Sequence, residues 1–498
     1  MSARWMRRAL VSSGALLLSA CGVVRPATGP GGPVPDANPP EVQREMRGLW
    51  IATVRNIDWP SRTGLTAAQQ QAELVDLLDR ARNAGLNAIF FQVRPNADAL
   101  YRSSLEPWGM MFSGTQTDPG WDPLEFAVRE AHARGLQLHA WFNPYRAGNA
   151  ADSASFAANH VSRTNPEIVR RYGGGLWMDP GEPETLERTM RVVVDVVRRY
   201  DVDGVHTDDY FYPYPIQDST RRTVDFPDSA THARYGNGLA RDDWRRANVD
   251  RFVERFAREV HAVKPAVQVG ISPFGIWRPG HPAQITGLDA YAALYADARK
   301  WIQEGWLDYL APQLYWASAP PPQSFPVLLD WWIAQNAHGR HLWPGLAVYR
   351  ENTTERAPFP PGEIVSQIRQ TRARSGATGH LLYNTTWTLK RNGDGMAPTL
   401  AREVYQTPAI PPATPWLDRT PGGPGAPTLV PAASALRIAG NGEAARWWVV
   451  RSLGAEGWAT RVQRGSDEAV SLGSGVRRVI VFGVDAAGVA GPVTEWRR

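Results

Sequence analysis

The stretch TAAQQQAELVDLLDRARNAGLNAIFFQVRP (66–95) contains the repeating unit that predicts the fold. In its first part, Leu74 and Leu78 lie on one face of a helix, and Gly85 follows in the position of a helix-ending glycine. The run AIFFQV (88–93) that comes next is apolar and aromatic, as a buried strand is. The unit therefore predicts a helix that packs against a strand of a parallel sheet.

The same alternation of strand and helix runs through the first four-fifths of the chain. We predict strands at 47–54, 88–93, 137–143, 204–208, 268–273, 309–315, 342–349 and 380–384. We predict helices at 66–84, 124–134, 185–199, 243–263, 291–304, 325–337, 363–374 and 399–405. Eight strands alternating with eight helices predict an α/β protein with a (β/α)₈ TIM barrel. A doubly wound sheet is the alternative, but a Gly-rich phosphate loop follows none of these strands.

The composition divides the chain into further parts. The barrel is expected at 44–407, and a Pro/Gly-rich linker follows at 408–428. Short alternating runs separated by glycine turns then predict a small β-sandwich at 429–498, similar to a fibronectin III domain.

The first residues are typical of an exported protein. Residues 1–20 combine three arginines, a short apolar run and the small residues that precede a cleavage site. The LSAC sequence that ends at Cys21 resembles the bacterial lipobox, in which the cysteine carries a lipid. Gly22 at the next position implies sorting to the outer membrane, facing the periplasm. Residues 21–43 are then a flexible Pro/Gly-rich tether.

The charge gives little support for a nucleic-acid partner. The net charge is +5, and it falls to +2 without the three arginines of residues 1–20. The chain contains no block of five like charges. Its 21 tryptophans can pack in a core or stack on sugar rings, so their number alone does not decide whether the protein binds carbohydrate.

In such a barrel the catalytic groups lie where the strands end. The fourth predicted strand ends in Asp208 and Asp209, and alternation places His206, Asp208 and Tyr210 on one face. Two neighbouring carboxyl groups are suited to glycosidic cleavage, because one protonates the leaving oxygen while the other stabilises the transition state. Packing of like charges would also raise the pKa of one acid. We therefore predict Asp208 and Asp209 as the catalytic pair, with a capping role for Asp209 in the following loop as the alternative.

The candidates for a further catalytic acid are Asp98, Glu106, Glu351 and Asp394. Each of them can also be a loop cap. The polar and aromatic residues at the other strand ends are predicted to bind substrate: Arg94, Asp98, Glu106, His139, Asn143, Tyr145, Arg146, His206, Tyr210, Phe274, Trp277, Gln313, Tyr315, Trp316 and Asn384. For Arg94 and Arg146 the alternative is that they anchor Asp98, and for His139 and His206 it is a place inside the barrel. We expect no metal and no cofactor.

Several of these segments form an ordered set of motifs: MRGLW (46–50), QVRP (92–95), DALY (98–101), EPW (106–108), WDPL (121–124), AWFNPYR (140–146), HTDDYFYP (206–213), SPFGIW (272–277) and PQLYW (312–316). The set resembles the glycosyl hydrolase-like family 10 lipoproteins over residues 45–405. Thr207 is a small departure, since relatives tend to carry an aromatic residue there. Residues 203–210 are loosely similar to chitinase-type barrels as well, but Tyr210 stands where those carry the proton-donating Glu, so substrate-assisted catalysis stays open.

The resemblance implies a TIM barrel with glycoside hydrolase activity and a central role for the acids of the fourth strand. In outer-membrane members it implies cleavage of peptidoglycan glycan strands stripped of their peptides. We therefore expect an endo-acting hydrolase of that polysaccharide. Two alternatives remain: a hydrolase of another exported polysaccharide, and a barrel that binds cell-wall glycan without cleaving it.

Overall fold

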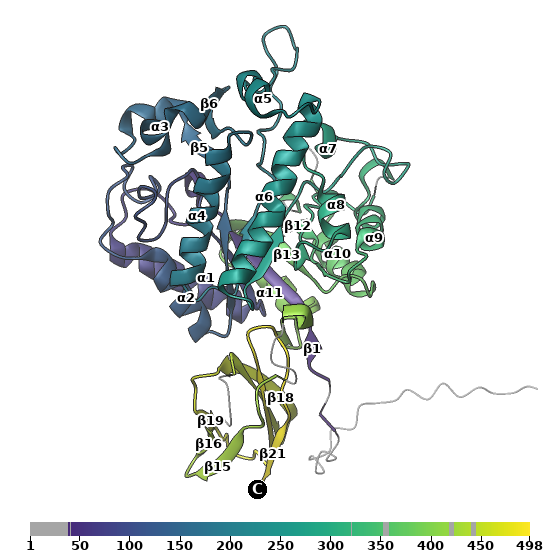
Figure 1. Cartoon of the computed structure of the whole chain (residues 1–498). Helices are drawn as coiled ribbons and strands as arrows, with labels where there is room; N and C mark the ends of the chain where they lie inside the picture. The colour runs from purple at the N-terminus through teal and green to yellow at the C-terminus, as the bar shows by residue number, and fades with distance from the viewer. Residues whose placement is uncertain (1–37, 40, 320, 352–357, 418–422, 440–444) are drawn as a thin grey trace, which may run out of the picture.

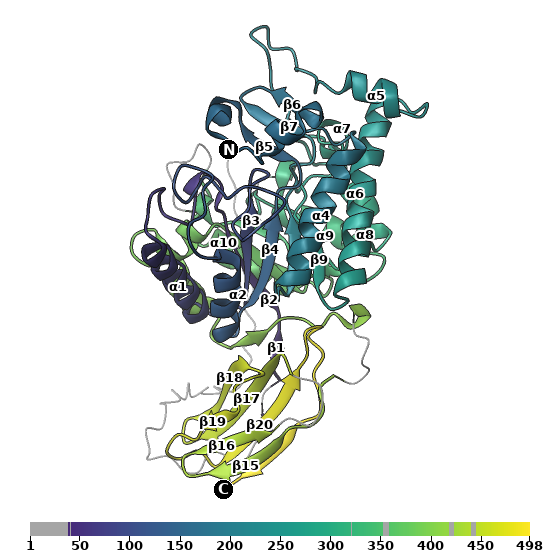
Figure 2. The ribbon, with the colours of Figure 1, turned by 60° about the vertical axis from the view of Figure 1, so that its left-hand side comes forward.

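The computed structural model describes residues 38–39, 41–319, 321–351, 358–417, 423–439 and 445–498. The predicted signal peptide and Cys21 lie outside these residues. A larger α/β domain sits above a smaller β domain that contains the C-terminus (Figures 1 and 2). Within the described part of the chain, no helix is both long enough and apolar enough to cross a membrane.

The centre of the larger domain is one sheet of parallel strands. Its strands are β2 (Met46–Ile51), β3 (Ala88–Arg94), β4 (Gln137–Phe142), β8 (Gly204–Thr207), β9 (Gln268–Ile271), β10 (Tyr309–Leu310), β11 (His341–Leu342), β12 (Gly345–Ala347) and β13 (Gly379–Tyr383). They are ordered β11-β10-β9-β8-β4-β3-β2-β13-β12.

The two ends of this sheet are halves of a single predicted strand, 342–349. It is interrupted at Pro344, which has no N–H to donate to a neighbouring strand. The half before the proline, β11, pairs with β10, and the half after it, β12, pairs with β13. The sheet therefore closes through this segment, and the pairing fits the predicted TIM barrel.

The predicted helices form outside the sheet, with shifted ends. They are α1 (Ala67–Asn83), α2 (Pro123–Ala133), α4 (Pro183–Arg199), α6 (Arg241–Val263), α7 (Ala290–Ala293), α8 (Ala298–Gln303), α9 (Phe325–Gln335), α10 (Glu363–Arg372) and α11 (Ala397–Glu403). The prediction of one helix over 291–304 was wrong. It is two short helices, because Tyr295 between them has a φ of 55°, which a right-handed helix does not allow.

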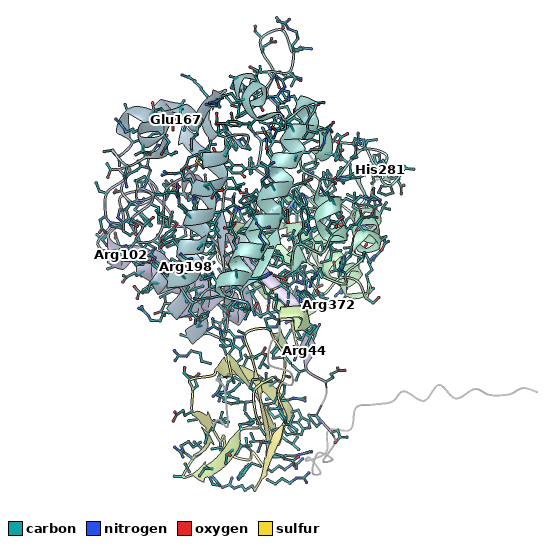
Figure 3. All side chains as sticks on the ribbon, in the orientation of Figure 1. Arg44, Arg102, Glu167, Arg198, His281 and Arg372 are labelled. Atoms are coloured by element: carbon teal, nitrogen blue, oxygen red, sulfur yellow. The ribbon has the colours of Figure 1, made fainter. Side chains whose placement is uncertain are left out.

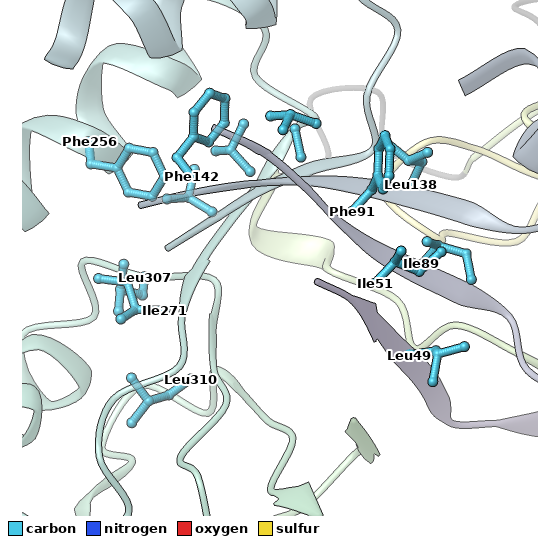
Figure 4. Close-up of a cluster of buried hydrophobic side chains, with 14 of the residues drawn as sticks. Leu49, Ile51, Ile89, Phe91, Leu138, Phe142, Phe256, Ile271, Leu307 and Leu310 are labelled. Carbon is cyan, nitrogen blue, oxygen red and sulfur yellow. The ribbon is translucent and has the colours of Figure 1, made fainter. Parts of the chain in front are cut away.

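Alternation along the strands separates two cores. Leu49 and Ile51 of β2 point outward to the helices, and so do Ile89 and Phe91 of β3 (Figure 4). Residues between them point into the barrel, where a second cluster includes Trp50, Phe90, Trp141, Tyr309 and Trp343. By the same period of two, Val205 faces the helices while His206 and Asp208 face the interior.

A small antiparallel sheet was not predicted. The chain after β4 forms β5 (Arg146–Asn149), β6 (Val169–Tyr172) and β7 (Gly175–Met178), ordered β5-β7-β6. The short helices α3 (Val161–Thr164) and α5 (Ser229–Tyr235) lie near it. Figure 2 shows this sheet at the end of the barrel opposite the C-terminal domain.

The C-terminal domain has the predicted antiparallel strands in two sheets. One contains β15 (Thr428–Ala432), β16 (Ala435–Ala439) and β19 (Ala469–Ser471); the other contains β17 (Trp447–Gly454), β18 (Gly457–Arg464), β20 (Arg478–Val484) and β21 (Thr494–Arg497). Leu436, Trp448 and Val481 belong to one buried cluster that joins the two sheets. The likeness to fibronectin III remains a prediction.

The two domains meet at the base of the barrel. The predicted linker contributes β14 (Ala409–Ile410), which pairs with β1 (Gln43–Arg44). Arg44 also donates a hydrogen bond to the carbonyl oxygen of Gly488 in the C-terminal domain, over 2.6 Å. Figure 3 labels Arg44 at this junction, with Arg372 just above it.

Candidate active site

Asp208 follows the last residue of β8 and is almost completely buried, at 4% exposure. Its carboxylate receives three N–H donors. The side chain of Asn143 donates over 3.0 Å, the indole of Trp141 over 3.2 Å and the backbone of Tyr210 over 3.3 Å. Burial raises the pKa of Asp208, whereas the charge of Arg146 and these donors oppose the rise.

Asp209 is buried next to it, at 1% exposure. The hydroxyl of Tyr214 donates a short hydrogen bond to its carboxylate. Burial, followed by the charge of Asp208, raises the pKa of Asp209 to about 6, and the hydrogen bonds from Tyr214 and Gln313 only partly oppose this. The expected rise in one pKa of the pair therefore has burial as its main cause. Because Tyr214 lies in the next loop, this hydrogen bond also ties Asp209 to that loop.

Half-buried aromatic rings surround the two acids. Phe274 packs edge-on against Trp316, with ring centroids 5.5 Å apart, and also contacts Tyr214. Tyr315 stacks on Tyr383 at 5.8 Å. Aromatic faces of this kind stack on the apolar faces of sugars. Phe274, and Trp316 through it, are thus connected to Tyr214, which donates to Asp209, and Tyr315 interacts electrostatically with Asp209.

Tyr210 and Gln313 also belong to this group. The charges of Asp208 and Asp209 contribute to raising the pKa of Tyr210 to about 12, after burial, which is the main cause. The side chain of Gln313 donates to the carbonyl oxygen of Ser272 over 3.0 Å in addition to its contact with Asp209. Gln313 therefore contacts Asp209 and Tyr210 lies beside the acid pair, and substrate contact by either residue stays a prediction.

Arg94 and Glu106 form a buried ion pair behind the site. Nε and Nη2 of Arg94 contact the carboxylate of Glu106 at 2.7 and 2.5 Å, and both side chains are fully buried. Nη1 of Arg94 donates to the carbonyl oxygens of Asn143 and Pro144 over 2.6 and 2.9 Å. The pair therefore fixes the end of β4, from which Asn143 reaches Asp208. Its burial does not support the predicted contact of Arg94 and Glu106 with substrate.

His206 and His139 occupy the barrel interior, at 0% exposure. The indole N–H of Trp50 donates to Nε2 of His206 over 3.2 Å, so this nitrogen is unprotonated and the ring proton is on Nδ1, near the hydroxyl of Tyr309. Burial lowers the pKa of both histidines, that of His139 to about 4. The alternative of interior residues fits both, and their positions do not support substrate contact.

The ring of His139 is accommodated by a small residue on the next strand. A Cβ at Gly204 would lie 2.2 Å from Nδ1 of His139, so only glycine leaves room for the imidazole. The ring stacks on Phe90 with centroids 4.4 Å apart. In the described residues no group of three His, Cys, Asp or Glu side chains is arranged to hold a metal ion.

Four more predicted residues have other surroundings. Asp98 is buried and accepts from the backbone N–H groups of its own loop; burial raises its pKa to about 7. Tyr145 packs on Phe252 of α6, outside the barrel. Trp277 stacks on Trp331 of α9. Asn384 accepts from the backbone of its own turn.

The other candidates for a further acid are engaged elsewhere. Asp394 is exposed and pairs with Arg80 of α1 at 2.9 Å. Glu351 accepts a hydrogen bond from the backbone of Gly362, and burial raises its pKa. Neither contact involves Asp208 or Asp209.

Sequence reasoning missed four residues near the acids: Trp141, Tyr214, Tyr383 and Trp177. The inward position of Trp141 could have been predicted, because it lies two residues after His139 on the same strand and the two side chains therefore point to the same face. Trp177 comes from β7 and stacks on Tyr210 at 6.3 Å. Its sheet was not predicted, so its position had no signal.

The geometry allows the two acids to play different parts. Burial raises the pKa of both acids. At Asp208 the charge of Arg146 and three N–H donors oppose the rise, whereas at Asp209 the charge of Asp208 adds to it. A carboxylate and a neutral carboxylic acid side by side are the pair that glycosidic cleavage requires.

Comparisons with known proteins agree with this chemistry. A family model described as glycosyl hydrolase-like 10 matches residues 45–357. Glycosyl hydrolase YngK of Bacillus subtilis is 41% identical over 388 residues, which cover 76% of this chain and 75% of the relative. Glycosyl hydrolase DigH of Escherichia coli is 36% identical over 374 residues, covering 69% of this chain and 83% of the relative.

A solved structure, the catalytic domain of β-amylase from Paenibacillus polymyxa, is similar with a TM-score of 0.49 at 12% identity, covering 74% of this chain and all of that one, 100%. The family match and the two relatives decide between a hydrolase and a barrel that only binds glycan. The chain belongs to the glycosyl hydrolase-like 10 family and is a glycoside hydrolase.

Proposed function

We propose that this glycoside hydrolase is endo-acting and cleaves peptidoglycan glycan strands that have lost their peptides. The observation that carries the chemistry is the buried pair Asp208 and Asp209 at the end of β8, with aromatic rings around it. Asp209, whose pKa is raised to about 6, donates the proton to the leaving oxygen. Asp208 stays charged and stabilises the sugar cation that develops in the transition state.

We further propose that Cys21 carries a lipid that anchors the protein in the outer membrane, facing the periplasm. The support is the arginine-rich and apolar sequence before a single cysteine, and the Pro/Gly-rich stretch that follows it. A tether of this kind would keep the barrel within reach of the cell wall. Metabolic labelling with a clickable fatty acid tests the anchor, since Cys21→Ala would lose the label.

Release of reducing ends tests the substrate. Purified protein that lacks residues 1–21 is incubated with glycan strands freed of peptide by an amidase, with intact peptidoglycan and with a neutral polysaccharide. We expect new reducing ends and shortened chains from the denuded strands. If the protein binds these strands but releases no ends, the proposed substrate is wrong. Cleavage of another exported polysaccharide alone would favour the alternative hydrolase.

A further inference from the structure

Arg146 lies beside the acid pair with both neighbouring rings in contact. It is the first residue of β5, and its backbone N–H donates to the side-chain oxygen of Asn143 over 2.8 Å. Its guanidinium carbon lies 4.5 Å from the ring centre of Tyr210 and 5.9 Å from that of Trp177. The rings hold the guanidinium in place by cation–π contact and leave its N–H edge for another partner.

That edge has no acidic partner among the described residues. None of their carboxylate oxygens lies within the 4.0 Å of a salt bridge to Arg146. Arg94, at the end of the neighbouring strand, is by contrast fully neutralised by Glu106. The charge of Arg146 lowers the pKa of Asp208, so the two groups are near each other without being paired. Arg146 is also half-buried rather than fully solvated.

A second arginine acts electrostatically on the same tyrosine. Arg55 is exposed in the loop after β2, and its charge, like that of Arg146, opposes the rise in the pKa of Tyr210. Among the described residues it likewise has no carboxylate within 4.0 Å. Two positive charges therefore act on Tyr210, next to the predicted cleavage point. A wholly neutral glycan would offer neither arginine a carboxylate to pair with.

We propose that Arg146, assisted by Arg55, binds a carboxylate substituent of the sugar next to the bond that is cleaved. Guanidinium groups bind carboxylates through two parallel N–H···O bonds, which makes the contact strong and directional. This inference rests on the proposed function: a glycan strand stripped of peptide has a free lactyl carboxylate on each muramic acid. A peptide attached there converts this group to a neutral amide, so the same arginine selects strands that have lost their peptides.

Matched substrates test this recognition. Denuded strands are compared with the same strands after carbodiimide coupling of their carboxyl groups to methylamine, which removes the charge and keeps the sugars. Wild-type protein, Arg146→Gln and Arg55→Gln are assayed on both. Arg129→Gln is the control, because Arg129 lies over Phe126 on α2, in the same kind of cation–π contact but on another face.

For the wild type we expect amidation to raise KM about 10- to 100-fold, the usual range for loss of hydrogen bonds to a charged group. Arg146→Gln should raise KM on the acidic strands by a similar factor and be insensitive to amidation. Arg55→Gln, at an exposed side chain, should give a smaller change of the same kind. Arg129→Gln should behave as the wild type.

Other results would separate the possible failures. If the wild type cleaves acidic and amidated strands equally well, carboxylate recognition is wrong while the hydrolase stands. If Arg146→Gln lowers kcat equally on both substrates, the residue acts only through Asp208, which also overturns the inference. No cleavage of either substrate contradicts the proposed function itself. Arg146-dependent cleavage of a uronic-acid polymer would support carboxylate binding and assign it to a different acidic sugar.

Discussion

The side-chain amide of Asn143 donates to Asp208 over 3.0 Å, and this hydrogen bond joins the ends of the neighbouring strands β4 and β8. Asn143 is in turn held through its carbonyl oxygen by Arg94, and Arg94 is held by Glu106. The orientation of the central acid thus depends on a buried ion pair that does not touch it. Such a support fixes a side chain better than a loop alone would.

Replacing Glu106 by Gln should weaken both the fold and the site. Arg94 would remain buried without a counter-charge, so we expect the free energy of unfolding to fall by about 3 kcal/mol. The activity should fall as well, because Asn143 loses its fixed position. Urea unfolding followed by tryptophan fluorescence measures the first effect. The control is Asp118→Asn in the exposed pair with Arg102, where a change below about 0.5 kcal/mol is expected. Equal losses in both variants would argue against the buried support.

The raised pKa of Asp209 predicts the pH dependence of cleavage. If neutral Asp209 donates the proton, activity is present below pH 6 and is lost as the pH rises through about 6. The hydrogen bond from Tyr214 stabilises the charged form of Asp209. Tyr214→Phe should therefore raise the pKa of Asp209 and move the upper limb of the profile of kcat/KM to higher pH. The check is a rate profile from pH 4 to 9.

A matched control for this variant is Tyr200→Phe. The hydroxyl of Tyr200 donates to Asp122 over 2.6 Å at the start of α2, away from the acid pair. Tyr200→Phe loses the same kind of hydrogen bond and should leave the upper limb of the kcat/KM profile unchanged. A limb that moves to lower pH in Tyr214→Phe would contradict the assignment of Asp209 as the acid.

The C-terminal domain should stabilise the barrel from its base. Arg446 contacts Asp203, the residue before β8, at 2.8 Å. Burial alone would raise the pKa of Asp203, but the charges of Arg446 and His132 hold it below the usual value. This contribution to stability is present above the ordinary pKa of Asp, near 4, and is lost at lower pH. Arg446→Ala should lower the free energy of unfolding by about 3 kcal/mol at pH 7.

The difference between wild type and Arg446→Ala should shrink as the pH falls below 4, because the Asp203 carboxyl then binds a proton in the unfolded chain while the folded wild type still holds it charged. Thermal and urea unfolding at pH 7 and pH 3 measure it. Arg437→Ala on the exposed face of β16 provides the control and should have little effect. Since Asp203 and Asp208 are at opposite ends of β8, cleavage at pH 7 should be nearly unchanged in Arg446→Ala. A loss of activity with unchanged stability would show that the domain acts on the site.

Much of the barrel could be predicted because its strands repeat one pattern. The period of two placed Asp208 and His206 on the inner face, and the structure agrees. The period of two shows that a side chain points inward, but it does not show how far along the strand the residue lies. It therefore could not distinguish an inward residue at the end of the barrel, near the acids, from one buried in the barrel interior. His139 and His206 were therefore offered as substrate contacts, although their hydrogen bonds lie within the barrel.

Contacts between distant segments had no local signal. Trp177 reaches Tyr210 through a sheet of short strands, and the charge of Arg55 acts on Tyr210 from the loop after β2. The pairing of Arg94 with Glu106 was also hidden, because both residues fitted a substrate-facing loop equally well. Their burial distinguishes a supporting residue from one that faces the glycan.

The most direct test of the central claim is the kcat of Asp208→Asn on denuded glycan strands. Asn keeps the shape of the side chain and removes the charge, so the fold should be preserved in circular dichroism and thermal unfolding. We expect kcat to fall about 10³-fold, within the range for loss of a group that stabilises charge in the transition state, with KM changed little. Cleavage at the wild-type rate by a correctly folded Asp208→Asn protein would contradict the assignment of the active site to the end of β8.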